Sequence, residues 1–154
     1  MTKNNKKEEF RYLPKFADLI DRLSIDIMKK IFIHSHKKMY GEEIDDIMHD
    51  IDLLIKKGDL KFNAKTIHSL LVIMLTNREI WLNESKAREG KKEHDILLKF
   101  THSVNGIRNT AKNIISKEIG DRIDLKIDTL AEEFVAENFI EKHGDWRIFE
   151  DDNT

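Results

Sequence analysis

The stretch PKFADLIDRLSIDIMKKIF, residues 14–32, carries the clearest helical pattern in the chain. Its apolar residues recur at steps of three and four positions, which places them along one side of an α-helix. These residues are Phe16, Leu19, Ile20, Leu23, Ile27 and Ile31. Pro14 stands where the first turn of a helix tolerates a missing backbone N–H. We therefore predict a helix that begins close to Pro14 and ends near His34.

The same spacing recurs in three further long segments, at residues 41–58, 63–87 and 96–120, and in a shorter one at 127–135. Asn63 is a suitable N-cap and Gly120 a suitable stop. One Pro and six Gly among 154 residues leave few positions to interrupt a sheet. These features predict an all-α fold, a compact bundle of about five helices. We expect a flexible segment at 1–12, a single helical domain at 13–140 and an irregular acidic tail at 141–154.

Residues 63–87 contain the dense apolar run LLVIML at positions 70–75. In this segment we expect Ile67, Leu71, Met74 and Leu75 to face the core. The run predicts a central and largely buried helix.

Composition narrows the possible functions. The 27 Lys and Arg residues against 29 Asp and Glu give a formal charge of -2, which provides no general attraction to nucleic acid or to an anionic membrane. Without Cys, the chain has no thiolate zinc site and no nucleophilic thiol. The N-terminus lacks a secretory signal, and no apolar run is long enough to span a bilayer. We expect a cytoplasmic protein that binds neither membrane nor nucleic acid.

The segments TNREIWLNESKAREG and THSVNGIRNTAKN are rich in Asn, Arg and His for helices. If their helices are antiparallel neighbours, the cations can converge on a phosphate, the amides can read polar edges and the Trp can stack. This predicts a site for an anionic nucleotide-like or sugar-phosphate molecule. Its candidate ligand-binding residues are Asn77, Arg78, Trp81, Arg88, His102, Asn105, Arg108, Asn109 and Lys112. The alternative is a surface helix pair in which the Arg residues pair with Glu79, Glu84 and Glu89.

Residues 41–58 carry an acidic set in which Glu42, Glu43 and Asp46 have the spacing that presents carboxylates to one Mg²⁺ ion. This spacing resembles one half of the metal site of the all-α nucleotide pyrophosphohydrolases, with Asp46 in place of that family's last Glu. The family's second half, Glu-x-x-Asp, is missing, because Leu82 and Ala87 occupy the positions where it would end. His49 and Asp50 also resemble the His-Asp pair of metal-dependent phosphohydrolases. A solvated acidic face is the preferred explanation of these residues.

The phrases FADLIDRLSI, NREIWLNESKAREG and HSVNGIRNTAKNIISKEIGDRIDLKIDTLAEE together resemble uncharacterised helical proteins of tailed phages. The first phrase is also similar to helical proteins of unknown function from bacterial sugar-biosynthesis loci. The resemblance implies a phage or phage-like origin and no particular catalysis.

The leading hypothesis is a homo-oligomeric protein that sequesters a small anionic ligand and needs no cofactor. One alternative is a magnesium-dependent nucleotide phosphohydrolase that uses Glu42, Glu43 and Asp46. The other is a protein–protein interaction module, such as an inhibitor of a host enzyme, that uses an exposed helix face.

Overall fold

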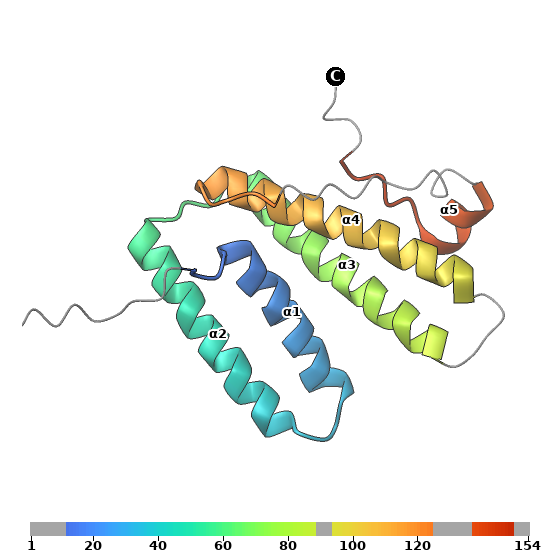
Figure 1. Cartoon of the computed structure of the whole chain (residues 1–154), viewed down its shortest axis with the longest axis horizontal. Helices are drawn as coiled ribbons and strands as arrows, with labels where there is room; N and C mark the ends of the chain where they lie inside the picture. Colours follow the sequence, from blue (N-terminus) through green and yellow to red (C-terminus); the bar gives the residue numbers. More distant parts are fainter. Residues whose placement is uncertain (1–11, 89–93, 125–136, 150–154) are drawn as a thin grey trace, which may run out of the picture.

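A computed structural model describes residues 12–88, 94–124 and 137–149 of the chain. Within these ranges every regular element is a helix, which confirms the all-α prediction. The helices are α1 (Phe16–Phe32), α2 (Lys37–Gly58), α3 (Ala64–Arg88), α4 (His94–Ile119) and α5 (Glu137–His143) (Figure 1). None of them is long and apolar enough to cross a membrane.

The N-terminal boundary of α2 differs from the prediction. The helix begins at Lys37, four residues before Gly41. His36 precedes it with a positive φ of 66°, and the Tyr40 N–H donates to the His36 carbonyl, so the turn at 35–36 leads directly into the helix. Gly41 lies inside the helix, with Lys30 of α1 as its neighbour. A lone Gly in an otherwise periodic segment is therefore tolerated here and does not mark the start of the helix.

The boundaries of α3 and α4 agree with the sequence signals. Asn63 caps α3, since its Oδ1 accepts hydrogen bonds from the Thr66 N–H at 2.9 Å and the Thr66 hydroxyl at 3.0 Å. Gly120 ends α4 with a φ of 76°, and the next N–H, that of Asp121, donates to the Ser116 carbonyl at 2.8 Å. The fifth helix predicted at 127–135 lies outside the described residues. The described α5 covers the first three residues of the predicted tail.

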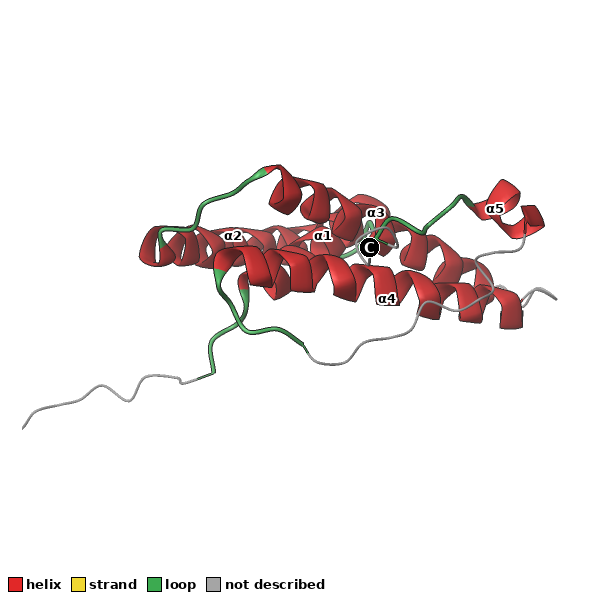
Figure 2. Cartoon of the chain, turned by 90° about the horizontal axis from the view of Figure 1, so that it is seen from above, coloured by secondary structure: helices red, strands yellow, loops and turns green. Residues whose placement is uncertain are grey.

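The four long helices form two hairpins, α1 with α2 and α3 with α4. α3 packs most extensively on α4, and α2 packs mainly against α1. α1 also contacts both α3 and α4, so it lies between α2 and the second hairpin (Figure 1). The connection at 59–63 carries the chain from α2 across to α3 (Figure 2). The result is a bundle in which α1 joins the two halves.

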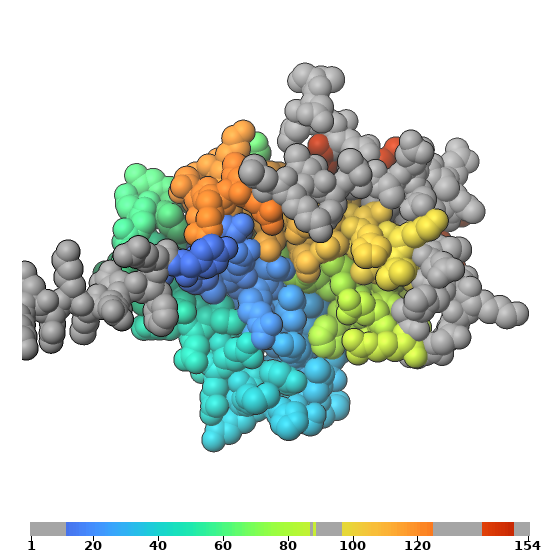
Figure 3. Space-filling view, viewed as in Figure 1, coloured from blue at the N-terminus to red at the C-terminus, as the bar shows by residue number. Residues whose placement is uncertain are grey.

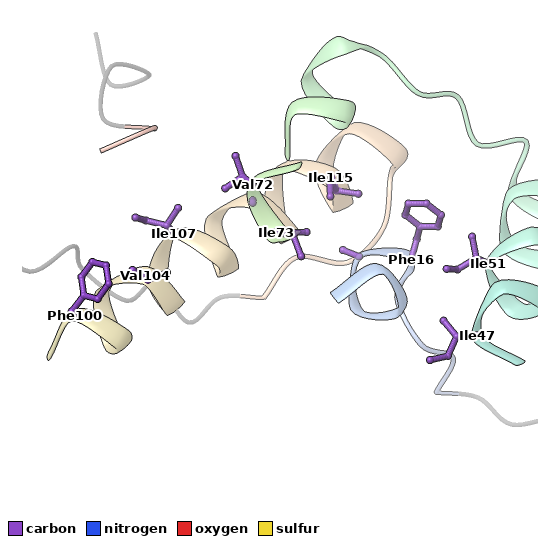
Figure 4. Packing of buried hydrophobic residues seen from close by; sticks show 11 residues of the cluster. Phe16, Ile47, Ile51, Val72, Ile73, Phe100, Val104, Ile107 and Ile115 are labelled. Atoms are coloured by element: carbon purple, nitrogen blue, oxygen red, sulfur yellow. The ribbon is translucent and has the colours of Figure 1, made fainter. Parts of the chain in front are cut away.

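The apolar core runs along this arrangement. Phe100, Val104 and Ile107 form one end on α4, and Ile47 and Ile51 of α2 form the other. The Phe16 ring of α1 lies between the α4 and α2 contributions (Figure 4). The two aromatic residues that follow α5, Trp146 and Phe149, pack against the same cluster. The acidic C-terminal stretch therefore contributes two apolar side chains to the core.

The orientation of α3 contradicts the stripe predicted for it. Ile67, Leu71 and Leu75 are 52, 62 and 55% exposed, while Val72 and Ile73 of the same run are buried. The buried face of α3 is instead largely polar, and its polar members are Thr66, Ser69, Thr76, Asn77 and Asn83. Three- and four-residue spacing places residues on a common face, but it does not say which face the neighbouring helix covers.

Replacing the N-cap of α3 tests the local basis of the second hairpin. In Asn63→Ala the Thr66 N–H loses its acceptor, so we expect the free energy of unfolding to fall by about 1 kcal/mol in urea denaturation. Asn63→Ser keeps a capping oxygen and loses the 2.7 Å hydrogen bond from Asn63 to Glu118. We expect Asn63→Ser to retain most of the stability, and equal losses in both variants would contradict a capping role.

Candidate functional site

The side chain of Asn77, on α3, lies at the centre of a polar network between α1, α3 and α4. Asn77 is only 3% exposed. Its Nδ2 donates to Asp21 Oδ1 and to Ser24 Oγ of α1, each at 2.7 Å, and its Oδ1 accepts a hydrogen bond from Arg108 Nη1 of α4 at 2.9 Å. Both amide protons and the amide oxygen are therefore engaged by protein groups.

The two cations of α4 in this network face carboxylates. Lys112 Nζ lies 2.8 Å from Asp18 Oδ1 and 3.3 Å from Asp21 Oδ2, and Arg108 Nη1 lies 3.9 Å from Asp21 Oδ1. Arg108 Nη2 also donates to Asn105, one turn earlier on α4. Among the atoms described for Arg108, the buried Nε has no hydrogen-bond partner. Two cations and two carboxylates thus neutralise one another.

The structure brings together four of the nine predicted ligand residues: Asn77, Asn105, Arg108 and Lys112. Arg78, Arg88 and His102 are exposed, and none of them forms a hydrogen bond or ion pair with the network in the described part of the chain. Trp81 stacks on Phe32 of α1, with ring centroids 6.1 Å apart and an interplanar angle of 29°. Asn109 is half-buried.

The arrangement determines what the network can do chemically. A phosphate that approached Arg108 and Lys112 would have to replace Asp18 and Asp21 as the partners of these cations. The side chains of Arg108, Lys112 and Asp21 are 20, 19 and 14% exposed, so the network lies at the edge of the core and remains within reach of solvent. Its evident role is to attach α1 to α3 and α4. Capture of a nucleotide-like anion at this place stays a prediction.

The carboxylates Asp18 and Asp21 are the members of this network that sequence reasoning missed. They lie three residues apart on α1, with Ser24 a further three along, so they share one side of that helix. This polar line borders the apolar stripe of α1, and its regular spacing is the feature of the sequence that could have indicated a polar contact with another helix.

The acidic set of α2 has its own partners in α1 and within α2. Glu43 Oε1 accepts a hydrogen bond from Arg22 Nη2 of α1 at 2.6 Å, and Glu42 lies 3.8 Å from Lys38. The hydrogen bond from Arg22 lowers the pKa of Glu43 below its usual value. Arg22 also contacts the fully buried carboxylate of Asp26 at 3.2 Å, and Lys29 completes that group at 3.1 Å.

These contacts bear on the alternative metal site. In the ranges 12–88, 94–124 and 137–149, no three His, Asp or Glu side chains gather closely enough to hold a metal ion. Glu42, Glu43 and Asp46 share a helix face by spacing, but Glu43 is directed toward Arg22 of α1. The described residues provide no preformed Mg²⁺ site.

The chain matches no protein-family model, and no curated protein or solved structure is significantly similar to it.

Substitution of Arg108 tests whether the network is structural. Arg108→Ala removes the donor to Asn77 and Asn105 and leaves Asp21 with one cation fewer, so we expect the free energy of unfolding to fall by about 1–3 kcal/mol. Arg78→Ala, at an exposed position, should change it by less than about 0.5 kcal/mol. Urea denaturation measures both values.

The same variant separates the structural role from ligand capture. If Arg108 bound a nucleotide phosphate, Arg108→Ala would keep the unfolding free energy of the wild type and lose a nucleotide-dependent rise in melting temperature. That pair of results would contradict the structural assignment.

The pair of Arg22 and Glu43 predicts an acid-sensitive contact between α1 and α2. Because the folded-state pKa of Glu43 is lowered, its contribution to stability is present above the unfolded-state pKa of about 4.3 and is lost as pH falls through the folded-state value. We expect Glu43→Gln to cost about 1 kcal/mol or less at neutral pH and nothing at the acid end of the titration. Glu42→Gln is the matched control. An equal and constant loss at all pH values would contradict the ion pair.

Proposed function

We propose that this protein is an interaction module that pairs with a second copy of itself through the outer face of α3. The outer stripe is defined here as Ile67, Leu71 and Leu75. The single observation that carries the proposal is that these three side chains are each more than half exposed, although Leu71 and Leu75 belong to the most apolar run of the chain. An exposed contiguous apolar surface is characteristic of an interaction site.

The opposite face of α3 strengthens this argument. Thr66 bonds to the N-cap Asn63, and Thr76 Oγ1 donates to the carbonyls of Val72 and Ile73 at 2.9 Å, so these two hydroxyls are satisfied locally. Asn77 is bonded by α1 and α4, whereas the buried Ser69 Oγ has no hydrogen-bond partner among the described residues. α3 therefore presents polar groups to its own bundle and apolar groups outward. A helix that functioned only as scaffold would have the reverse arrangement.

The spacing of the outer stripe suits a copy of the same chain. Positions i, i+4 and i+8 form one straight row on a helix, and in an antiparallel twofold pair Leu71 meets Leu71 of the other copy while Ile67 meets Leu75. All three are branched aliphatic side chains of similar size, so the row is complementary to itself. Covering the exposed half of each contributes about 1 kcal/mol per side chain.

Two neighbours extend this surface. Met74, half-buried, lies between Leu71 and Leu75 in the sequence. Trp81, also half-buried, lies one to two turns beyond Leu75 on α3, past the exposed Arg78. Trp81 in turn stacks on Phe32, which is half exposed at the end of α1. The surface available to a partner is thus larger than the outer stripe alone, as a specific interface requires.

Light scattering coupled to size exclusion tests the proposal across a range of protein concentrations. We expect the wild type to populate a dimer and Leu71→Glu to be monomeric, because a carboxylate at the centre of the interface would be buried opposite its own symmetry mate. Met48→Glu is the matched control, since Met48 of α2 is 51% exposed and lies away from the outer stripe. We expect Met48→Glu to remain dimeric.

A wild type that is monomeric at every concentration would contradict the proposal. If Leu71→Glu also lowered the melting temperature of that monomer, the outer stripe would be assigned to packing within one chain. Circular dichroism of each variant establishes that the fold is retained.

A further inference from the structure

A pocket of about 390 Å³ opens where α1 begins and α2 and α4 end. Its apolar lining is Leu13, Pro14, Phe16, Leu54, Leu60 and Ile119. Figure 3 shows the start of α1 beside the end of α4 on this face of the molecule. The volume is within the range of small-molecule sites, about 300–1,000 Å³. The elements that form the pocket are separate from the outer stripe of α3, so the pocket is independent of the proposed self-association.

Two cations line this apolar pocket, and neither is paired with a carboxylate of the described residues. Lys57 forms no hydrogen bond or ion pair with any described residue. Arg122 Nη2 donates to the Leu13 carbonyl at 2.6 Å, and its guanidinium lies 4.4 Å from the centroid of the Tyr12 ring. These contacts fix the position of the guanidinium and leave its charge uncompensated by a side-chain carboxylate in the described structure.

The remaining charged residue of the pocket, Asp121, is already engaged. Its Oδ1 accepts a hydrogen bond from the Arg122 backbone N–H at 2.8 Å, and its Oδ2 accepts one from the Phe16 N–H at 3.4 Å. Asp121 therefore satisfies the first turn of α1 and is directed toward the backbone. The net charge of the three ionised groups that line the pocket is positive.

Two glycines, Gly58 and Gly120, line the pocket. A Cβ at Gly58 would lie 2.9 Å from Leu60 Cδ2, so the absence of a side chain allows Leu60 to occupy its place in the wall. A Cβ at Gly120 would meet nothing within 4 Å, so this part of the lining borders open space. The apolar wall and the opening with its two cations are thus built from the same short segments.

We infer that this pocket binds a single-chain amphipathic anion, such as a medium-chain carboxylate. The alkyl chain packs against Phe16, Leu54 and Ile119, and the head group is neutralised by Lys57 and Arg122. The carbonyl ends of α2 and α4 lie in the same region and favour a cation. Lys57 and Arg122 offset the partial negative charge of these helix ends. The decisive measurement is therefore whether the pocket prefers an anionic or a cationic ligand.

Calorimetric titration of the full chain with decanoate, below its micelle concentration, tests the inference. We expect saturable binding of decanoate, and weaker binding of decyltrimethylammonium, which has the same chain length and the opposite charge. Leu54→Trp fills the pocket and should weaken decanoate binding by about tenfold or more. Leu53→Trp, at the adjacent exposed position outside the lining, should leave it unchanged.

Lys57→Gln tests the head group and does not alter the pocket wall. We expect it to weaken decanoate binding by about threefold, since the charge is solvent-accessible, while the neighbouring Lys56→Gln has no effect. The inference is overturned if decanoate fails to saturate, if the ammonium binds at least as well, or if Lys57→Gln and Lys56→Gln behave alike. Because Lys57 is exposed, this comparison remains valid even if Leu54→Trp does not fold.

Discussion

The bundle depends on α1 being attached on two sides at once. Toward α2 and the end of α4 its contact is mainly apolar and includes the Phe16 ring, with the pair of Arg22 and Glu43 at the exposed side. Toward the middle of α3 and α4 it is polar, through Asp21, Asn77 and Arg108. Removing one partner from a buried polar group costs more than the net gain of forming the pair. The polar contact therefore specifies one position of α1 along the second hairpin, whereas apolar packing alone tolerates alternatives.

Much of this fold could be predicted from local signals. The helix in 14–32, the N-cap at Asn63 and the stop at Gly120 each depend on residues within a few positions of one another, and the structure has all three. The apolar stripe of that helix joins the core from Phe16 to Leu23, but its last member, Ile31, is 56% exposed. Of the four cations expected to converge, Arg78 and Arg88 are exposed, whereas Arg108 and Lys112 do meet, together with Asn77 and Asn105. Their purpose could not be derived, because the carboxylates that pair with them lie 56 or more residues away on α1.

The outward-facing apolar stripe of α3 is a second feature that the sequence did not predict. A hydroxyl that donates to the carbonyl four residues back, as Thr76 does to Val72, has its hydrogen bond satisfied without water. Such a residue can be buried against a helix with small side chains, and α4 contributes Ala111 and Ser116 to its buried face. The spacing of apolar residues in 63–87 correctly predicts a helix, but the prediction that Ile67, Leu71 and Leu75 face the core is wrong. Which face of α3 is buried depends on where α4 packs against it.

Because α2 is attached mainly to α1, it can detach from the bundle before the rest of the chain unfolds. Detaching α2 exposes Ile47 and Ile51 and breaks the pair of Arg22 with Glu43, yet it leaves the contact of α3 with α4 in place. Opening of such a unit requires less free energy than global unfolding. Amide hydrogens of α2 therefore exchange with solvent through a partly unfolded state. Amide hydrogens at the contact of α3 with α4 exchange only when the whole chain unfolds.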